Sequence, residues 1–265
     1  MDLVRIRASS LGDLFDCGAR WKARNIDHII MPTSGAAQLG TAVHAGTALY
    51  DTSRMNNEGL TIDDCVGAVV DTIYHPEEDV DWSEQNQKEA EEIATALHKL
   101  YCEKIAPHKT YVAVEAKCDN LEIMDLGIVL TGSTDRVSVN DKGEYGICDL
   151  KTGRSAVAAD GTVKTAGYAA QLGMYELLGS YSIGKPITAP AEIIGLQVAK
   201  TDRGRRVGIA PVIGARQLLL GTDEEEGLLE IAASFIRAGR FPGNPRSQIC
   251  SPKYCPVYNE CRFRK

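Results

Sequence analysis

The chain has 265 residues, of which 44% are hydrophobic and 25% charged, a composition that excludes a disordered or collagen-like protein. A chain of this length buries about 70–75% of the surface that its unfolded form exposes, so it can hold a large core without disulfides. The net charge of −7 excludes nucleic-acid coating by bulk charge, although a local basic strip can still contact DNA. With no run of about 18–20 apolar residues and no signal peptide, we expect a cytoplasmic protein with no membrane partner.

The first hundred residues have the periodicity of helices. A serine cap followed by Leu11, Leu14 and Phe15 predicts a helix that runs to about Asn25. After a break at Pro32–Gly35, the apolar spacing predicts three more helices, over residues 36–52, 61–74 and 83–104.

After Pro107 the pattern changes to the alternation typical of strands. We expect strands over 111–118, 128–139, 145–150, 191–199 and 207–212, with turns at 140–143 and 202–204 and helices over 165–181 and 214–237. This order predicts an α/β (mixed α+β) fold, in which helices flank a central mixed sheet. The interpretation is one domain, 1–265, with a helical N-terminal part (1–106), a core (107–238) and a cysteine-rich tail (239–265).

A carboxylate–lysine group is expected where the 128–139 and 145–150 strands pair. Asp149 and Lys151 share one face of their strand, and pairing through the turn brings Asp135 beside Asp149. Two such carboxylates stay ionised together only with a cation between them, and oxygen ligands select Mg²⁺ or Mn²⁺. A lysine beside that ion can orient water or stabilise charge on a phosphate, which indicates phosphodiester hydrolysis.

The alternative is a hairpin whose exposed face happens to carry Asp and Lys. A second acid-x-lysine tripeptide, Glu115–Lys117, shows how common the pattern is. We prefer 149–151, because an acid-bearing strand precedes it across a hairpin and none clearly precedes Glu115.

Three further residues are candidates for the same site. His44 follows small residues that let its helix lie close to another backbone, and Gln171 and Tyr175 lie one turn apart on one helix face. Each also has a structural explanation: a packed histidine, a solvated glutamine and a core tyrosine.

Cysteines at both chain ends predict a second metal site. Cys250, Cys255 and Cys261 fall within twelve residues, and Cys17 is the candidate fourth ligand. Four thiolates suit Zn²⁺ or a 4Fe–4S cluster, and the spacing alone does not choose between them. Either group would clasp the two ends of the chain, and a disulfide or a free-cysteine tail is the alternative.

Together these residues resemble the RecB-type branch of the PD-(D/E)XK nucleases that carries an iron–sulfur clasp, including the CRISPR-associated single-domain exonucleases. The resemblance rests on four motifs in order, with one cysteine before them and three after: Gly40–His44, Gly132–Asp135, Asp149–Lys151 and Gln171–Tyr175. The C-x4-C-x5-C spacing at the end departs from the C-x2-C-x5-C of that branch.

The resemblance implies a restriction-endonuclease-like core and a role for each motif. His44, Asp135, Asp149 and the Leu150 carbonyl would bind the catalytic Mg²⁺ or Mn²⁺, and Lys151 would act on the attacking water. Gln171 and Tyr175 would lie over the active site, in contact with phosphate or a water on the metal. It also implies a 4Fe–4S cluster at Cys17, Cys250, Cys255 and Cys261, with Zn²⁺ as the alternative.

The expected function is therefore metal-dependent DNA cleavage, by an exonuclease in recombination, repair, phage DNA processing or CRISPR adaptation in a bacterial, archaeal or phage-infected cell. A basic cluster is expected to contact single-stranded DNA or duplex ends, in a salt-dependent way: Lys200, Arg203, Arg205 and Arg206. Without a P-loop, a helicase would be a separate chain, as would an annealing or CRISPR partner. The alternatives are a non-catalytic DNA-binding or assembly subunit with the same fold and a zinc-clasped regulatory protein.

Overall fold

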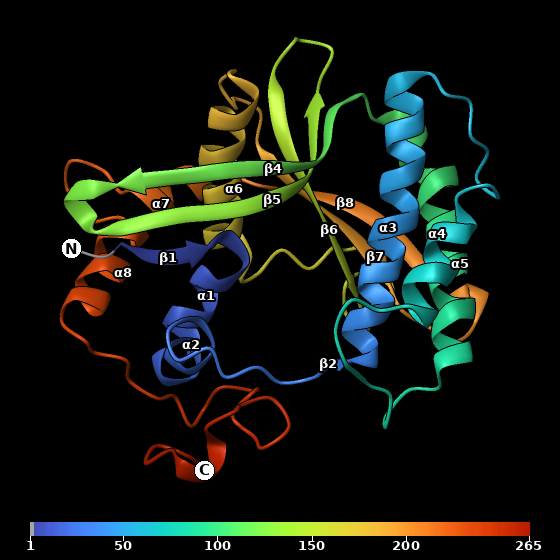
Figure 1. Cartoon of the computed structure of the whole chain (residues 1–265). Helices are drawn as coiled ribbons and strands as arrows, with labels where there is room; N and C mark the ends of the chain where they lie inside the picture. The colour runs from blue at the N-terminus through green and yellow to red at the C-terminus, as the bar shows by residue number, and fades with distance from the viewer. Residues whose placement is uncertain (1–2) are drawn as a thin grey trace.

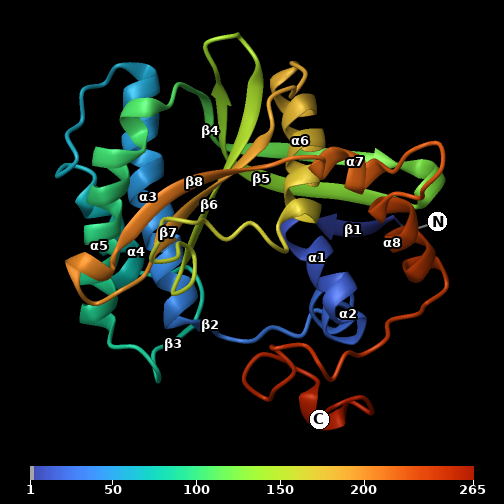
Figure 2. The same cartoon turned by 180° about the vertical axis from the view of Figure 1, so that it is seen from behind.

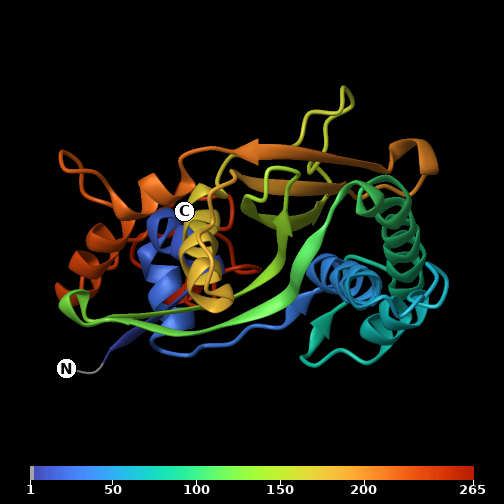
Figure 3. The ribbon, with the colours of Figure 1, turned by 90° about the horizontal axis from the view of Figure 1, so that it is seen from above.

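The structure, a computed structural model, describes residues 3–265 apart from the side chain of Asp119. A mixed sheet separates two groups of helices (Figures 1 and 3). One group covers β6 and β7 with a core of its own and consists of α3 (Gly35–Asn56), α4 (Val66–Tyr74) and α5 (Gln87–Lys104). The other forms the second core with β1 and β5 and consists of α1 (Ala8–Asp16), α2 (Gly18–Asn25), α6 (Ala169–Ile183), α7 (Ala215–Leu220) and α8 (Leu228–Arg237).

The sheet has six strands in the order β1-β5-β6-β7-β8, and β4 pairs with the other edge of β5. Its strands are β1 (Val4–Arg7), β4 (Tyr111–Ile123), β5 (Ile128–Val139), β6 (Tyr145–Gly153), β7 (Ala191–Gln197) and β8 (Arg206–Val212). The β1–β5 and β6–β7 pairs are parallel, whereas the β4–β5, β5–β6 and β7–β8 pairs are antiparallel. The predicted mixed sheet flanked by helices is therefore confirmed.

The sheet splits along one edge of β5, and this split positions the site described below. β1 pairs with β5 up to Arg7 opposite Thr131, and β6 pairs with it from Cys148 opposite Arg136. Between these two pairings, in the described chain, residues 132–135 of β5 have no strand partner on this edge. Asp135 therefore lies where β5 passes from one neighbour to the other.

Two predicted helices are interrupted. The first breaks at Cys17, whose extended backbone (φ −153°, ψ 95°) separates α1 from α2. The last, expected over 214–237, is two helices, α7 and α8, joined by an acidic loop that starts at Gly221. A Cβ atom on Gly221 would lie 2.4 Å from the Glu225 carbonyl oxygen, so the tight turn there excludes a continuous helix.

Other boundaries also differ from the sequence prediction. β1 was not expected, β4 extends five residues beyond the predicted end at Cys118, and α6 begins four residues after the predicted start. The remaining short elements are the β2–β3 ribbon (Thr33–Ser34 with Val80–Asp81) and 3-10 turns at Ala106–His108, Met124–Leu126, Asp202–Gly204 and Tyr258–Glu260. Among residues 3–265, none of the helices combines the length and apolar character needed to cross a bilayer.

The C-terminal tail lies against the α1–α2 junction (Figures 1 and 2). Asn244 Nδ2 donates to the Asp16 carbonyl oxygen (3.0 Å), and Ser247 Oγ donates to Asp16 Oδ2 (2.7 Å). The rings of Trp21 and Phe241 stack with centroids 6.0 Å apart. These contacts bring Cys17, at the same junction, next to the tail.

Candidate active site

Three groups converge at the split in the sheet. Asp135 Oδ2 accepts a hydrogen bond from the Leu150 backbone N–H (2.7 Å), which ties β5 to β6. His44 reaches the same point from α3: its Nε2 lies 3.1 Å from the Leu150 carbonyl oxygen and its Nδ1 lies 3.5 Å from Asp135 Oδ1. The His44 imidazole therefore lies between a carboxylate and a carbonyl oxygen, and the structure brings these three sequence-selected residues together.

Asp149 and Lys151 lie beside this group on β6. The Asp149 carboxylate is 1% exposed, and its Oδ2 lies 2.6 Å from Lys151 Nζ. The Lys151 ammonium also lies 5.1 Å from the centroid of the Tyr168 ring, just before α6. Alternation along β6 thus places the acid and the amine on one face, as predicted.

The α6 helix adds two polar side chains to the site. Gln171 Nε2 donates to Tyr175 Oη (3.0 Å) and lies 3.5 Å from Asp149 Oδ1. Burial raises the pKa of Tyr175, and the Asp149 charge raises it further, so its hydroxyl stays protonated. Gln171 and Tyr175 therefore meet Asp149 as one hydrogen-bonded set.

The pKa values of the two buried aspartates shift in opposite directions. Burial and, after it, the charge of the Asp135 carboxylate raise the pKa of Asp149 to about 6, against the opposing charge of Lys151. Burial also acts to raise the pKa of Asp135, but the charges of His44 and Lys151 outweigh it and lower that pKa. A divalent cation would relieve this competition, because it stabilises both carboxylates in the ionised form.

Glu115 also belongs to this site, although the sequence analysis set it aside. One ligand atom each from His44, Glu115 and Asp135 lies within 4.8 Å of the others. The pairs Val114–Arg136 and Ala116–Thr134 place Glu115 opposite Asp135 across the β4–β5 ladder. The missing signal was this pairing, since β5 itself is the acid-bearing strand next to Glu115.

The backbone at Glu115 has a left-handed conformation (φ 48°), which is rare for a non-glycine residue within a strand. Such strained residues cluster at functional sites, where the surrounding structure holds them. Arg136 Nη1 contributes to this hold by donating to Glu115 Oε1 (3.2 Å). The donor set of one imidazole and two carboxylates, with a carbonyl oxygen nearby, fits a hard or borderline divalent cation.

The buried Arg136 side chain connects the backbone of Asp135 to a second buried aspartate, Asp51. The Arg136 side chain is fully buried; its Nε donates to Asp51 Oδ2 (2.7 Å) and its Nη1 donates to the Asp135 carbonyl oxygen (2.7 Å). Tyr101 Oη also donates to Asp51 Oδ2 (2.6 Å), and Arg136 Nη2 donates to Thr47 Oγ1 (3.2 Å). This network joins α3 and α5 to β5 at the residue next to Asp135.

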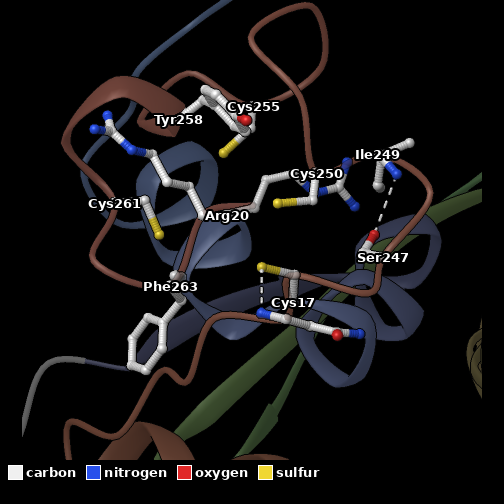
Figure 4. Close-up of a pocket in the computed structure, with 12 residues that line it drawn as sticks. Cys17, Arg20, Ser247, Ile249, Cys250, Cys255, Tyr258, Cys261 and Phe263 are labelled. Atoms are coloured by element: carbon white, nitrogen blue, oxygen red, sulfur yellow. Dashed lines mark hydrogen bonds between the residues drawn. The ribbon is translucent and has the colours of Figure 1, made fainter.

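The four predicted cysteines line one small pocket between the chain ends, with their sulfur atoms directed into it (Figure 4). All four are free thiols: Cys17, Cys250, Cys255 and Cys261. In the described chain, no three of the four sulfur atoms reach the mutual spacing of 4.8 Å that His44, Glu115 and Asp135 have. Four thiols that share one pocket form a ligand set that suits a metal ion or a metal cluster.

A buried arginine also faces the cysteine pocket. Arg20 is 5% exposed and lines the pocket; its Nη2 lies 2.8 Å from Asp13 Oδ1, but its Nε has no hydrogen-bond partner within residues 3–265. An unpaired buried donor is costly, and a thiolate-bound metal group carries the negative charge that would satisfy it. The chemistry of the pocket therefore fits an anionic metal–thiolate group.

The predicted DNA-contacting cluster is only partly free for a ligand. Arg205 donates to the carbonyl oxygens of Ala199 (3.0 Å) and Lys200 (2.9 Å), and Arg206 donates to that of Val157 (2.9 Å). Lys200 is exposed and pairs with Glu89 (2.8 Å), and Arg203 is exposed in the turn. The guanidinium groups of Arg205 and Arg206 therefore hydrogen-bond to the protein backbone.

Comparison with known proteins places this site in a family. Residues 5–262 match the family model of the PD-(D/E)XK nuclease superfamily. A crystal structure from Eubacterium rectale, of a protein provisionally described as an exonuclease, is similar with a TM-score of 0.53 and 15% identity, over 98% of this chain and 89% of that one. The solved structure of SSO0001 has 14% identity and a TM-score of 0.44, over 100% of this chain and 89% of that one. No curated protein shows significant similarity. The first structural likeness confirms the restriction-endonuclease-like fold, with its central mixed sheet.

Proposed function

Because the chain belongs to the PD-(D/E)XK nuclease superfamily, whose members use divalent metals, we propose that it hydrolyses DNA phosphodiester bonds at the split in the sheet. The observation that carries the proposal is the convergence of three ligand groups, from His44, Glu115 and Asp135, beside the Asp149–Lys151 pair. In this proposal residues 1–265 act as one nuclease domain of the RecB-type branch.

Each residue of the site then has a distinct role. His44, Asp135, Asp149 and the Leu150 carbonyl are proposed to hold Mg²⁺ or Mn²⁺, and the structure adds Glu115 to that set. When bound, the ion supplies polarisation of a phosphoryl oxygen and a more acidic water.

The remaining side chains act on the reacting groups or hold the ligands in place. The Lys151 ammonium, 2.6 Å from Asp149, is close enough to orient the attacking water and to stabilise charge that grows on the phosphate. The pair of Gln171 and Tyr175 fixes the Asp149 carboxylate through Gln171 Nε2. The proposed chemistry therefore needs no nucleophilic side chain.

The proposed mode is exonucleolytic, on DNA ends or single strands, in recombination, repair, phage DNA processing or CRISPR adaptation. The provisional exonuclease description of the Eubacterium rectale protein supports this mode. A separate helicase, annealing or CRISPR protein would deliver the strand, and Lys200 and Arg203 are the members of the predicted cluster proposed to contact it.

We also propose that Cys17, Cys250, Cys255 and Cys261 hold a 4Fe–4S cluster. The support is the pocket that the four cysteines share and the unpaired Nε of Arg20 beside them. Protein purified without oxygen should be brown, with broad absorbance at about 400 nm and iron in the metal analysis. Colourless protein with one zinc per chain would show that these cysteines bind Zn²⁺ and not an iron–sulfur cluster.

A time course of cleavage tests the proposed activity. End-labelled linear DNA and closed circular DNA, each single- and double-stranded, are incubated with wild-type protein or Asp135→Asn in Mg²⁺ or Mn²⁺. We expect stepwise loss of the linear substrates, intact circles and no cleavage by the variant. Wild-type protein that binds DNA but cuts none of the four substrates would instead identify a non-catalytic assembly subunit.

A further inference from the structure

A basic pocket lies beside β1 and α2, outside the residues of the candidate active site. Its cavity has a volume of about 430 Å³. Arg5 and Arg7 line it from β1, Arg24 from α2, and His28 from the segment that joins α2 to β2. We call these four residues, with Ile30, the basic pocket.

The cationic groups of this pocket are free to bind a ligand. Arg5, Arg7 and Arg24 are exposed, and within the described chain their guanidinium groups have neither an ion-pair partner nor a hydrogen bond. The acidic residue that lines the cavity is Glu78, 3.4 Å from the Thr33 hydroxyl. Three unpaired guanidinium groups in a protein with a net charge of −7 make this a local anion-binding surface.

The pairing of β1 with β5 aligns the pocket with the active site. Arg5 and Arg7 lie on one face of β1, while Ile6 between them is buried in the core on the other. Arg7 is opposite Thr131, four residues before Asp135, and the two strands run in the same direction (Figure 1). At a rise of about 3.3 Å per residue, this places Arg7 at a level about 13 Å along β5 from the Asp135 position. A nucleic-acid backbone spans such a distance in a few nucleotides.

Exposed apolar side chains adjoin the arginines. Ile30 is 84% exposed and lines the cavity, its neighbour Ile29 is 40% exposed, and Met31 also lines the cavity. A duplex hides the flat faces of its bases, whereas a single strand presents them to nearby apolar side chains. The combination of free arginines and exposed isoleucines therefore fits a single strand better than a duplex.

We propose that the basic pocket binds the phosphates of a single DNA strand a few nucleotides from the bond that is cut. The proposal rests on the proposed nuclease function and identifies where its substrate enters or leaves the site. It is independent of the sequence-predicted cluster, in which Arg205 and Arg206 bond to the backbone of the fold.

Binding of fluorescein-labelled oligothymidylate of about 20 nucleotides, followed by anisotropy in Ca²⁺ at several salt concentrations, tests this assignment. The double variant Arg5→Ala/Arg7→Ala should bind about tenfold more weakly. Its plot of log affinity against log salt should lose about 1.4 of slope, or 0.7 for each charge removed. The matched control, Lys142→Ala/Lys185→Ala, removes two exposed charges from the β5–β6 turn and the segment after α6 and should bind as the wild type does.

Two single variants on other elements extend the test. Arg24→Ala on α2 should weaken binding several-fold, and Glu78→Gln should tighten it, because it removes the carboxylate beside the pocket. The assignment is overturned if the double variant matches the control, or if it loses duplex affinity as much as single-strand affinity. If the wild type cleaves DNA while the double variant keeps its affinity, this inference fails and the proposed function stands. If the wild type neither binds nor cleaves DNA, the proposed function fails as well.

Discussion

The candidate active site and the cysteine pocket are built in opposite ways. In the active site, strands β4, β5 and β6 and helix α3 hold the ligand groups, and the Leu150 N–H fixes Asp135 at 2.7 Å. In the cysteine pocket the ligands come from the α1–α2 junction and a tail whose regular structure is one 3-10 turn. There the Cys17 thiol accepts one hydrogen bond, from the Asn244 N–H (3.4 Å).

This difference predicts different tasks for the two proposed metal groups. Backbone pairing in the sheet holds the carboxylates in place, so binding of a catalytic ion should contribute little to the free energy of folding there. The tail has no sheet or long helix to hold it, so we expect its order to depend in part on the proposed group that would join its cysteines to Cys17. For such a site, the free energy of metal binding is free energy of folding.

The largest expected effect is on catalysis. Asp149→Asn keeps the size of the side chain but removes a charge that faces Lys151, so cleavage in Mn²⁺ should fall by about 10³-fold. Thermal unfolding should change little, because burial and the Asp135 charge disfavour the ionised form of Asp149 and so offset the lost ion pair with Lys151. Asp223→Asn, in the exposed loop between α7 and α8, is the matched control. Cleavage by Asp149→Asn within tenfold of the wild type would remove this carboxylate from the site.

The next effect is on stability and tests what holds the active site in place. Asp51→Asn leaves the fully buried Arg136 without its closest counter-charge, and should lower the free energy of unfolding by about 3–5 kcal/mol. Urea denaturation measures the change. The control is Asp71→Asn, which removes an exposed pair with His75 and should cost less than about 1 kcal/mol. Equal effects of the two substitutions would show that the Arg136 network does not support the sheet.

The third prediction separates the two metal sites directly. Cys255→Ser should lose the metal bound at the cysteines and expose residues 239–265 to trypsin, while hydrogen exchange in β5 and β6 stays as in the wild type. Cys65→Ala removes a buried thiol from outside the pocket and should keep its metal. A tail that stays resistant to trypsin in Cys255→Ser would show that loop contacts alone order it.

The smallest expected effect is at Gln171, which bonds Tyr175 and approaches Asp149 without belonging to the metal-ligand set. Gln171→Ala removes a hydrogen bond to a charged group, so cleavage should fall by about 10- to 100-fold with the fold intact. Undiminished cleavage would show that Gln171 does not contribute to catalysis.

Most of the fold could be predicted because long helices and strands carry strong periodic signals. β1 was missed, since four residues are too few for alternation to stand out, although Val4–Arg7 does alternate. The break at Cys17 was missed because apolar spacing continues through it. Tertiary contacts accompany that break: the tail packs on Gly18, where a Cβ atom would lie 3.0 Å from Phe241 Cα.

The candidate site was predictable where its residues share one short hairpin or one helix turn. Asp135, Asp149 and Lys151 follow from the β5–β6 turn, and Gln171 and Tyr175 follow from helical spacing. Glu115 depends on the register of β4 against β5, which includes two shifts and which periodicity does not define. The alignment of the basic pocket with the active site depends on a parallel pairing between segments more than a hundred residues apart, which sequence order does not show.

The most direct test of the account is the position of a Mn²⁺ ion in a crystal of the wild-type protein, located by its anomalous scattering. The account predicts one strong peak in contact with His44, Asp135 and the Leu150 carbonyl oxygen, with Glu115 or Asp149 completing the carboxylate ligands. A peak elsewhere, or no peak between these residues at saturating Mn²⁺, would contradict it.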